Sequence, residues 1–176
     1  MKRFALCTIA LAFVAASCGG SPSSPNPTVL AKVTFTADLR TSNEVPPIAN
    51  AESSGSGTAT VTMDVTRDPS GNVVAGTATF VVTLSGFPAG TPINIAHIHQ
   101  AVAGVNGNVV VSSGLSAGEV VLRDGSGGFT RDRLTPANGD LSIFTAIINN
   151  PAGFYFNVHT ALNPGGVMRG QLVRTN

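Results

Sequence analysis

Residues 58–84 read TATVTMDVTRDPSGNVVAGTATFVVTL, and this stretch decides the fold class. Its first half alternates polar and apolar residues, as a strand with one buried face does, and the apolar set is Ala59, Val61, Met63 and Val65. Residues 68–72, DPSGN, combine the residue types that favour a turn. The second half places another apolar set on one face: Ala78, Phe80, Val82 and Leu84. The stretch therefore predicts two half-buried strands joined by a turn.

The same rhythm continues on both sides of this stretch. Further alternating or apolar runs, bounded by turn residues, lie at residues 33–39, 93–99, 109–111, 120–122, 154–160 and 167–173. Residues 141–148 differ, because their apolar side chains are spaced as on one face of a short helix, which Asp140 is placed to cap. About eight strands and one helix predict an all-β domain, built as an antiparallel sandwich or barrel. The expected core includes Phe80, Val82, Leu84, Phe156 and Val158.

The composition limits the partners of this chain. Charged residues make up only 11% of its 176 residues, and 10 Lys and Arg nearly balance 9 Asp and Glu. A nucleic-acid-binding domain needs a basic surface to meet the phosphates, so nucleic acid is not an expected partner. The apolar content of 43% is enough for one domain with its own core.

The first segment has the features of an export signal. Lys2 and Arg3 precede an apolar run over residues 4–16, which is too short to span a bilayer. The small residues before Cys18 resemble a bacterial lipobox, in which the cysteine is lipidated and becomes the mature N-terminus. Cleavage by an ordinary signal peptidase at the same place is the alternative. We expect a lipoprotein signal peptide over residues 1–17, a flexible tether over 18–29 rich in Gly, Ser and Pro, and a β-domain over 30–176.

This organisation predicts a location. A lipid on Cys18 would anchor the chain to a membrane of the bacterial cell envelope, outside the cytoplasm, facing the periplasm or the cell surface. Cys7 lies inside the expected signal peptide and would be removed with it. The mature chain would then hold no disulfide, so its stability would come from packing.

The three histidines fall in two places. His97 and His99 are two residues apart on an expected strand, so their rings lie on the same face, while His159 lies on another strand. If the strands are neighbours, one outer face would also carry a set of polar side chains: Tyr155, Asn157, Arg169 and Gln171. Three imidazoles suit a copper or zinc ion with one open position. The alternative is a hydrogen-bond network across the strands that holds loops in place.

Three separate motifs carry a resemblance to a known family. They are EVPP at residues 44–47, AHIH at 96–99 followed by GVNG at 104–107, and FNVHT at 156–160 with NPGG at 163–166 and RGQL at 169–172. Their order and spacing resemble the CHRD domain, the module repeated in chordin, over roughly residues 31–174. The resemblance implies an immunoglobulin-like sandwich and gives no catalytic residue to carry over. It also implies an acidic residue where this chain has Val167, which leaves the charge partner of Arg169 open.

These observations favour a function without catalysis. We expect a lipid-anchored binding or structural module of the CHRD type, whose low charge and Thr-rich outer faces suit contacts with a protein or a glycan. The alternative is a mononuclear copper or zinc protein that uses His97, His99 and His159 for redox chemistry or metal handling. The EVPP segment is expected to be a rigid turn that protects a sheet edge rather than part of a site.

Overall fold

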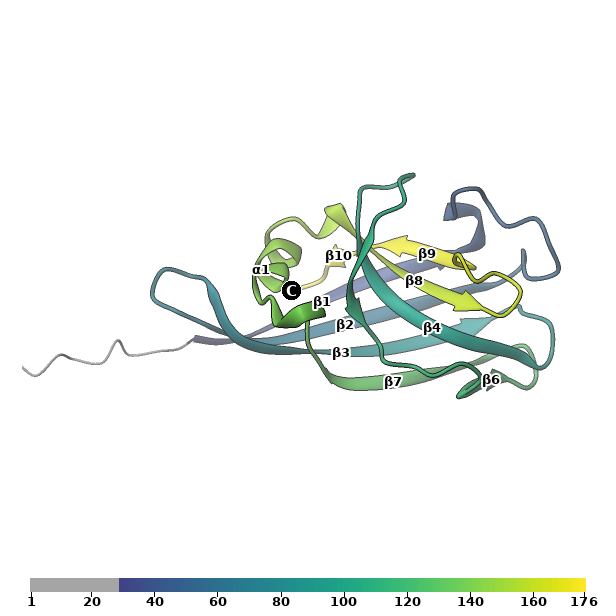
Figure 1. Ribbon diagram of the computed structural model, residues 1–176, viewed down its shortest axis with the longest axis horizontal. Coiled ribbons are helices and arrows are strands. Elements are labelled where there is room, and N and C mark those ends of the chain that lie inside the picture. The colour runs from purple at the N-terminus through teal and green to yellow at the C-terminus, as the bar shows by residue number, and fades with distance from the viewer. Residues whose placement is uncertain (1–28) are drawn as a thin grey trace, which may run out of the picture.

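The computed structural model describes residues 29–176, which form an all-β domain with one α-helix (Figure 1). The expected signal peptide, Cys18 and nearly all of the expected tether lie outside the described residues. The strands are β1 (Val29–Arg40), β2 (Ser56–Arg67), β3 (Val73–Ser85), β4 (Thr91–Gln100), β5 (Asn108–Ser112), β6 (Val120–Leu122), β7 (Gly127–Leu134), β8 (Phe154–Thr160), β9 (Met168–Gln171) and β10 (Val173–Arg174). The helix α1 spans Ser142–Asn149, and three short 3-10 helices are η1 (Thr41–Asn43), η2 (Ala137–Gly139) and η3 (Pro151–Gly153).

The strands form one ten-stranded sheet in the order β5-β4-β8-β9-β1-β2-β3-β7, with β10 paired to β1 and β6 paired to β4. Every pairing is antiparallel, and the sheet curves into a nearly closed, barrel-like form (Figure 1). The all-β prediction is confirmed, whereas the immunoglobulin-like sandwich of two sheets is not. The reason is β1, which pairs with β2 along its length and also with β9 and β10, and so joins the two halves into one sheet.

The hairpin over residues 58–84 forms as its pattern predicts. Val61 lies opposite Phe80 in the β2–β3 register, and both side chains are fully buried. In the turn, Asp68 Oδ1 accepts a hydrogen bond of 2.8 Å from the backbone N–H of Asn72. Gly71 follows with a φ of 87°, a conformation that glycine adopts without steric cost. Local chemistry is therefore enough to specify this hairpin.

The core fills the space between the two halves of the curved sheet. Phe80 on β3 meets Phe156 on β8 edge to face, with ring centroids 5.1 Å apart. The five expected core residues are all buried, from 0% exposure for Phe156 to 3% for Leu84. Burying a side chain of this size contributes about 2–3 kcal/mol, so contacts across the interior hold the sheet closed.

Helix α1 packs beside β3 (Figure 1). The ring of Phe144 lies close to Gly76 on that strand. Phe144, Ile147 and Ile148 are buried, as their spacing predicts. The N-cap residue of α1 is Leu141 rather than the expected Asp140, but Asp140 Oδ1 still accepts a 3.0 Å hydrogen bond from the backbone N–H of Ser142 at the start of the helix. Of the helices in residues 29–176, none has the length and apolar character needed to cross a bilayer.

Candidate functional site

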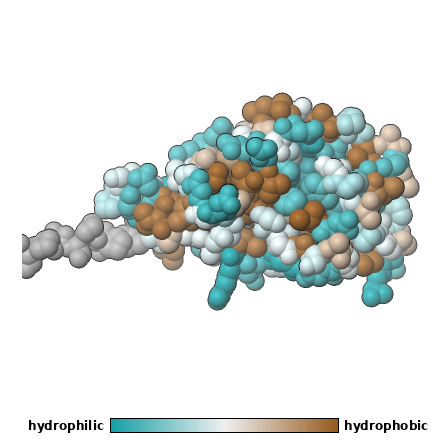
Figure 2. Space-filling model, in the orientation of Figure 1, coloured by the Kyte–Doolittle hydropathy of each residue, from teal (hydrophilic) through white to brown (hydrophobic). Residues whose placement is uncertain are grey.

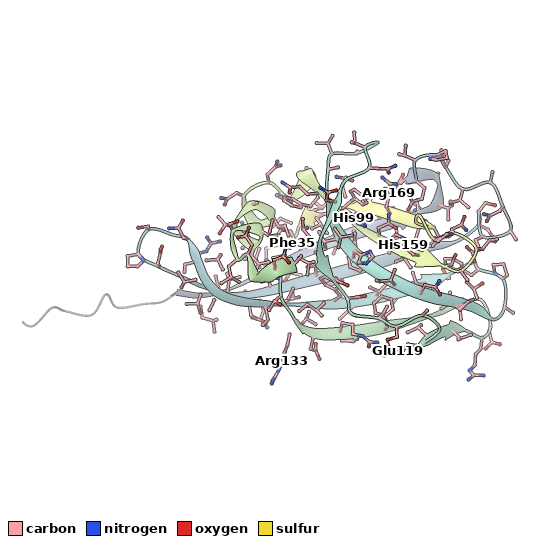
Figure 3. All side chains as sticks on the ribbon, viewed as in Figure 1. Phe35, His99, Glu119, Arg133, His159 and Arg169 are labelled. Carbon is pink, nitrogen blue, oxygen red and sulfur yellow. The ribbon has the colours of Figure 1, made fainter. Side chains whose placement is uncertain are left out.

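Strands β4, β8 and β9 lie side by side and bring the expected polar residues together. His97 pairs with Asn157 and His99 with Tyr155, and on the other side of β8 Asn157 pairs with Arg169. The apolar neighbours of these residues along the strands point into the core. Figure 3 shows His99, His159 and Arg169 gathered over these strands. The predicted convergence of the three histidines is confirmed, with Asn157 and Arg169 beside them.

The face that carries them was expected to be an outer one, and this expectation is wrong. His97, His99 and His159 are only 9%, 8% and 7% exposed, and Asn157 and Arg169 are buried as well. The reason is that three loops fold over the face: residues 41–55 after β1, residues 101–107 after β4 and residues 161–167 after β8. Strand periodicity gives the side of the sheet on which a residue lies, but it does not show what covers that side.

The histidine rings are packed against one another. Their centroids lie 5.1 Å apart for His97 and His159, 5.4 Å for His97 and His99, and 6.1 Å for His99 and His159. His97 Nδ1 is 3.4 Å from His159 Nε2. One nitrogen from each ring lies within 4.8 Å of the other two, so the cluster meets the distance requirement for a shared ion.

Two of the three rings have a defined tautomer. His99 Nδ1 lies 3.0 Å from the carbonyl oxygen of Gly107, and His159 Nδ1 lies 2.9 Å from that of Pro164. A carbonyl oxygen only accepts hydrogen bonds, so each Nδ1 carries the proton and each Nε2 carries a lone pair. The lone pair of His159 faces His97 Nδ1, whereas that of His99 has no partner. The same arrangement orients histidine ligands at metal sites, where the remote nitrogen donates to a carbonyl or carboxylate.

The environment keeps the three imidazoles neutral. Burial, followed by the charges of His159 and His99, lowers the pKa of His97 from 6.5 to about 4. Burial also lowers the pKa of His99 and of His159, although the carbonyl bonds described above oppose this effect. Neutral imidazole is the form that binds a metal ion, and it is also the form that suits a hydrogen-bond network.

Glu44, which lies in the EVPP segment, is the functional residue that sequence reasoning missed. Its Oε2 accepts hydrogen bonds from Arg169 Nε at 2.9 Å and Nη2 at 2.6 Å, and both side chains are at most 4% exposed. The expectation that EVPP is only an edge-protecting turn is therefore wrong. The pair also answers the question left open by Val167, because Glu44 is the charge partner of Arg169. The available signal was the presence of one acidic and one basic residue in two of the segments that carry the family resemblance, Glu44 in EVPP and Arg169 in RGQL.

Arg169 connects the loops to the sheet. Its Nη2 donates to Asn106 Oδ1 at 2.6 Å and its Nη1 to the carbonyl oxygen of Val105 at 3.2 Å. Its guanidinium also lies 4.6 Å from the centroid of the Tyr155 ring, which stacks on His99.

Gln171, the last member of the expected face, is partly buried and donates to the carbonyl oxygen of Ala101 at 3.1 Å. These contacts are those expected of a network that holds loops in place.

Three buried polar atoms in the described chain have no hydrogen-bond partner: Glu44 Oε1, His99 Nε2 and Asn157 Oδ1. All three belong to this one cluster, and all three present lone pairs. A Cβ added to Gly166 would lie 2.8 Å from the Asn157 amide and 3.0 Å from Glu44 Oε1, so both groups border the same point. The cluster therefore has a surplus of acceptors, which a cation or a hydrogen-bond donor would satisfy.

The covering loops also shape the surface of the molecule. A pocket of about 440 Å³ is lined by residues of the 42–47 segment together with Arg169 and Gln171, and a second of about 360 Å³ lies between that segment and residues 162–166. Exposed apolar side chains lie on the same three loops: Val45, Val102, Val105 and Leu162. Figure 2 shows apolar side chains at the tip of the loop that follows β4.

Comparison with known proteins gives one match. The family model described as CHRD domain matches residues 35–172, which include every strand of the polar cluster and all three covering loops. No curated protein and no solved structure matches the chain.

Proposed function

Because this chain belongs to the CHRD domain family, we propose that it is an extracytoplasmic, lipid-anchored module that binds a partner without catalysing a reaction. The observation that carries the proposal is the buried Glu44–Arg169 pair. Through Arg169, two of the covering loops are tied to β9, and Asn106 Nδ2 adds a 3.3 Å bond to the carbonyl oxygen of Val45. Loops held in this way form a surface that loses little conformational entropy on binding.

The third covering loop is held by a second buried carboxylate. Glu52 Oε2 accepts a 2.6 Å bond from Thr160 Oγ1 and a 2.5 Å bond from Asn163 Nδ2. These contacts join the loop after β1 to the loop after β8. The two pockets and the exposed valines therefore belong to one ordered surface, which supports a role in binding.

The chemistry of this surface favours a protein over a glycan as the partner. The seven phenylalanines and the one tyrosine among residues 29–176 are all buried, so the surface offers no aromatic ring on which a sugar could stack. Its exposed side chains are aliphatic, with polar groups around them, which is the usual composition of a protein-binding surface.

The position of the anchor supports the same function. The segment that carries Cys18 enters the domain at Val29, the first residue of β1, whereas Glu44 follows the end of that strand. A strand of 12 residues is about 36 Å long, so the covering loops lie at the far end of β1 from the anchor. A lipid on Cys18 would thus leave the proposed binding surface pointing away from the membrane.

Lipidation can be tested with a matched pair of cysteine variants. We expect the wild-type protein and Cys7→Ala to incorporate a radiolabelled fatty acid and to partition into detergent, because Cys7 is removed with the signal peptide. Cys18→Ala should lose the label while its domain stays folded. Label that persists in Cys18→Ala, or that is absent from the wild type, would contradict the anchored module.

A further inference from the structure

His99 and His159 each bind a loop carbonyl through Nδ1, but the ring nitrogens that face one another within the cluster have no role in the anchored module. We propose that His97, His99 and His159 bind one copper or zinc ion, and that Glu44 Oε1 and Asn157 Oδ1 accept hydrogen bonds from a water molecule on that ion. This proposal goes beyond the anchored module and takes up the alternative function suggested by the spacing of the histidines.

The spacing of the ring nitrogens is close to that of a metal site. Two nitrogens that bind one tetrahedral ion at 2.0–2.1 Å lie about 3.4 Å apart. His97 Nδ1 and His159 Nε2 are 3.4 Å apart, and the three candidate nitrogens all lie within 4.8 Å of one another. Each remaining pair of nitrogens would need to approach by at most about 1.4 Å to complete a three-nitrogen site.

Two of the proposed ligands are already oriented. The carbonyl oxygens of Gly107 and Pro164 hold the Nδ1 protons of His99 and His159, so the lone pairs of both Nε2 atoms are fixed. Both carbonyls belong to covering loops rather than to strands. The loops therefore supply the outer shell of the site while β4 and β8 supply the imidazoles.

The cluster holds more hydrogen-bond acceptors than its own donors satisfy. A network without an ion can let His97 Nδ1–H donate to His159 Nε2, but it leaves His99 Nε2, Glu44 Oε1 and Asn157 Oδ1 without donors. A hydrated ion accounts for all of them, because it binds the imidazole nitrogens and its water has two protons to donate. Gly166 leaves the point beside Glu44 and Asn157 free of a side chain.

Glu44 offsets part of the charge that Arg169 places beside the site. The Arg169 guanidinium is paired with Glu44 Oε2, so the pair has no net charge, and the second oxygen of the carboxylate remains free for the water. Imidazole nitrogen favours copper and zinc over calcium or magnesium, and copper(II) binds such sites more tightly than zinc.

The test is a metal titration of the full chain after removal of bound metal with a chelator. We expect one Zn²⁺ or one Cu²⁺ per chain, and a rise in Kd of more than about 100-fold in His99→Gln and His159→Gln, since loss of an outer-shell group alone costs 10–100-fold. Asn157→Ala should weaken binding by about 10–100-fold with unchanged stoichiometry. Gln100→Ala, an exposed neighbour of His99 on β4, is the control and should bind as the wild type does.

A second measurement does not depend on the folding of the variants. Nitrogen-15 NMR of the wild-type imidazoles should show the Nε2 signals of His99 and His159 shifting together when one equivalent of Zn²⁺ is added. Folded wild-type protein that binds neither ion, or histidine variants that bind with undiminished affinity, would overturn the proposal. The fatty-acid label on Cys18 reports on the anchored module separately, so the two proposals can fail independently.

Discussion

The buried Glu44–Arg169 pair should dominate the stability of the polar cluster. Glu44→Gln keeps the shape of the side chain but leaves the guanidinium without a counter-charge at a site where both side chains are at most 4% exposed. Removing one partner of such a pair costs about 3–5 kcal/mol, and Arg169→Met should cost a similar amount because it leaves the carboxylate unpaired. The double variant Glu44→Gln/Arg169→Met contains neither charge. We expect its loss to be about 2–3 kcal/mol smaller than the sum of the two single losses.

Equilibrium unfolding in urea, followed by far-ultraviolet circular dichroism, measures these free energies. The control is Asp38→Asn, which removes an ion pair with Arg40 whose side chains are 66% and 51% exposed. An exposed pair contributes at most about 1 kcal/mol, so this variant should stay close to the wild type. Single variants at Glu44 and Arg169 that lose no more than this control, or losses that simply add in the double variant, would refute the role given to the pair.

Two further predictions concern acid stability and the core. The pKa of His97 is lowered from 6.5 to about 4, so the unfolded chain takes up this proton first. The contribution of His97 to the free energy of unfolding should therefore be constant above pH 6.5, fall between pH 6.5 and 4, and level off below pH 4. The lowered pKa values of His99 and His159 change the free energy of unfolding in the same direction. His97 alone should contribute about 1 kcal/mol per pH unit after allowance for solvent screening. Urea unfolding at a series of pH values measures this slope. Phe156→Ala should destabilise the protein by about 3–5 kcal/mol, because the side chain is fully buried against Phe80, and a loss below about 1 kcal/mol would contradict the closed core.

The local parts of the fold could be predicted from the sequence because their signals are local. Alternation in residues 58–84 gave the β2–β3 hairpin and its buried face, and apolar spacing gave α1. The closure of the sheet depends on contacts between distant segments. β1 meets β9 at Arg40 and Arg169, a pairing that no periodicity within either strand reveals. That is why one continuous sheet forms where a sandwich of two was expected.

At the candidate site, too, local features were predicted correctly, whereas contacts between distant segments were not. The period of two along β4 and β8 correctly placed the histidines, Tyr155 and Asn157 on one face. Burial of that face was missed because it comes from loops, whose paths are determined by hydrogen bonds to the site itself. Glu44 was missed for a related reason, since a loop residue has no periodicity to show which way its side chain points. Its partner, Arg169, is 125 residues away along the chain.

Loop carbonyls hold His99 and His159 in one tautomer, with both Nε2 lone pairs directed into the buried cluster. Nitrogen-15 NMR of the metal-free protein at pH 7 measures this directly, because protonated and unprotonated imidazole nitrogens have distinct shifts. We predict that both rings are neutral, carry the proton on Nδ1, and become protonated only below pH 6.5. Protons on Nε2, or titration near pH 6.5 as in an exposed histidine, would contradict this arrangement of the two rings.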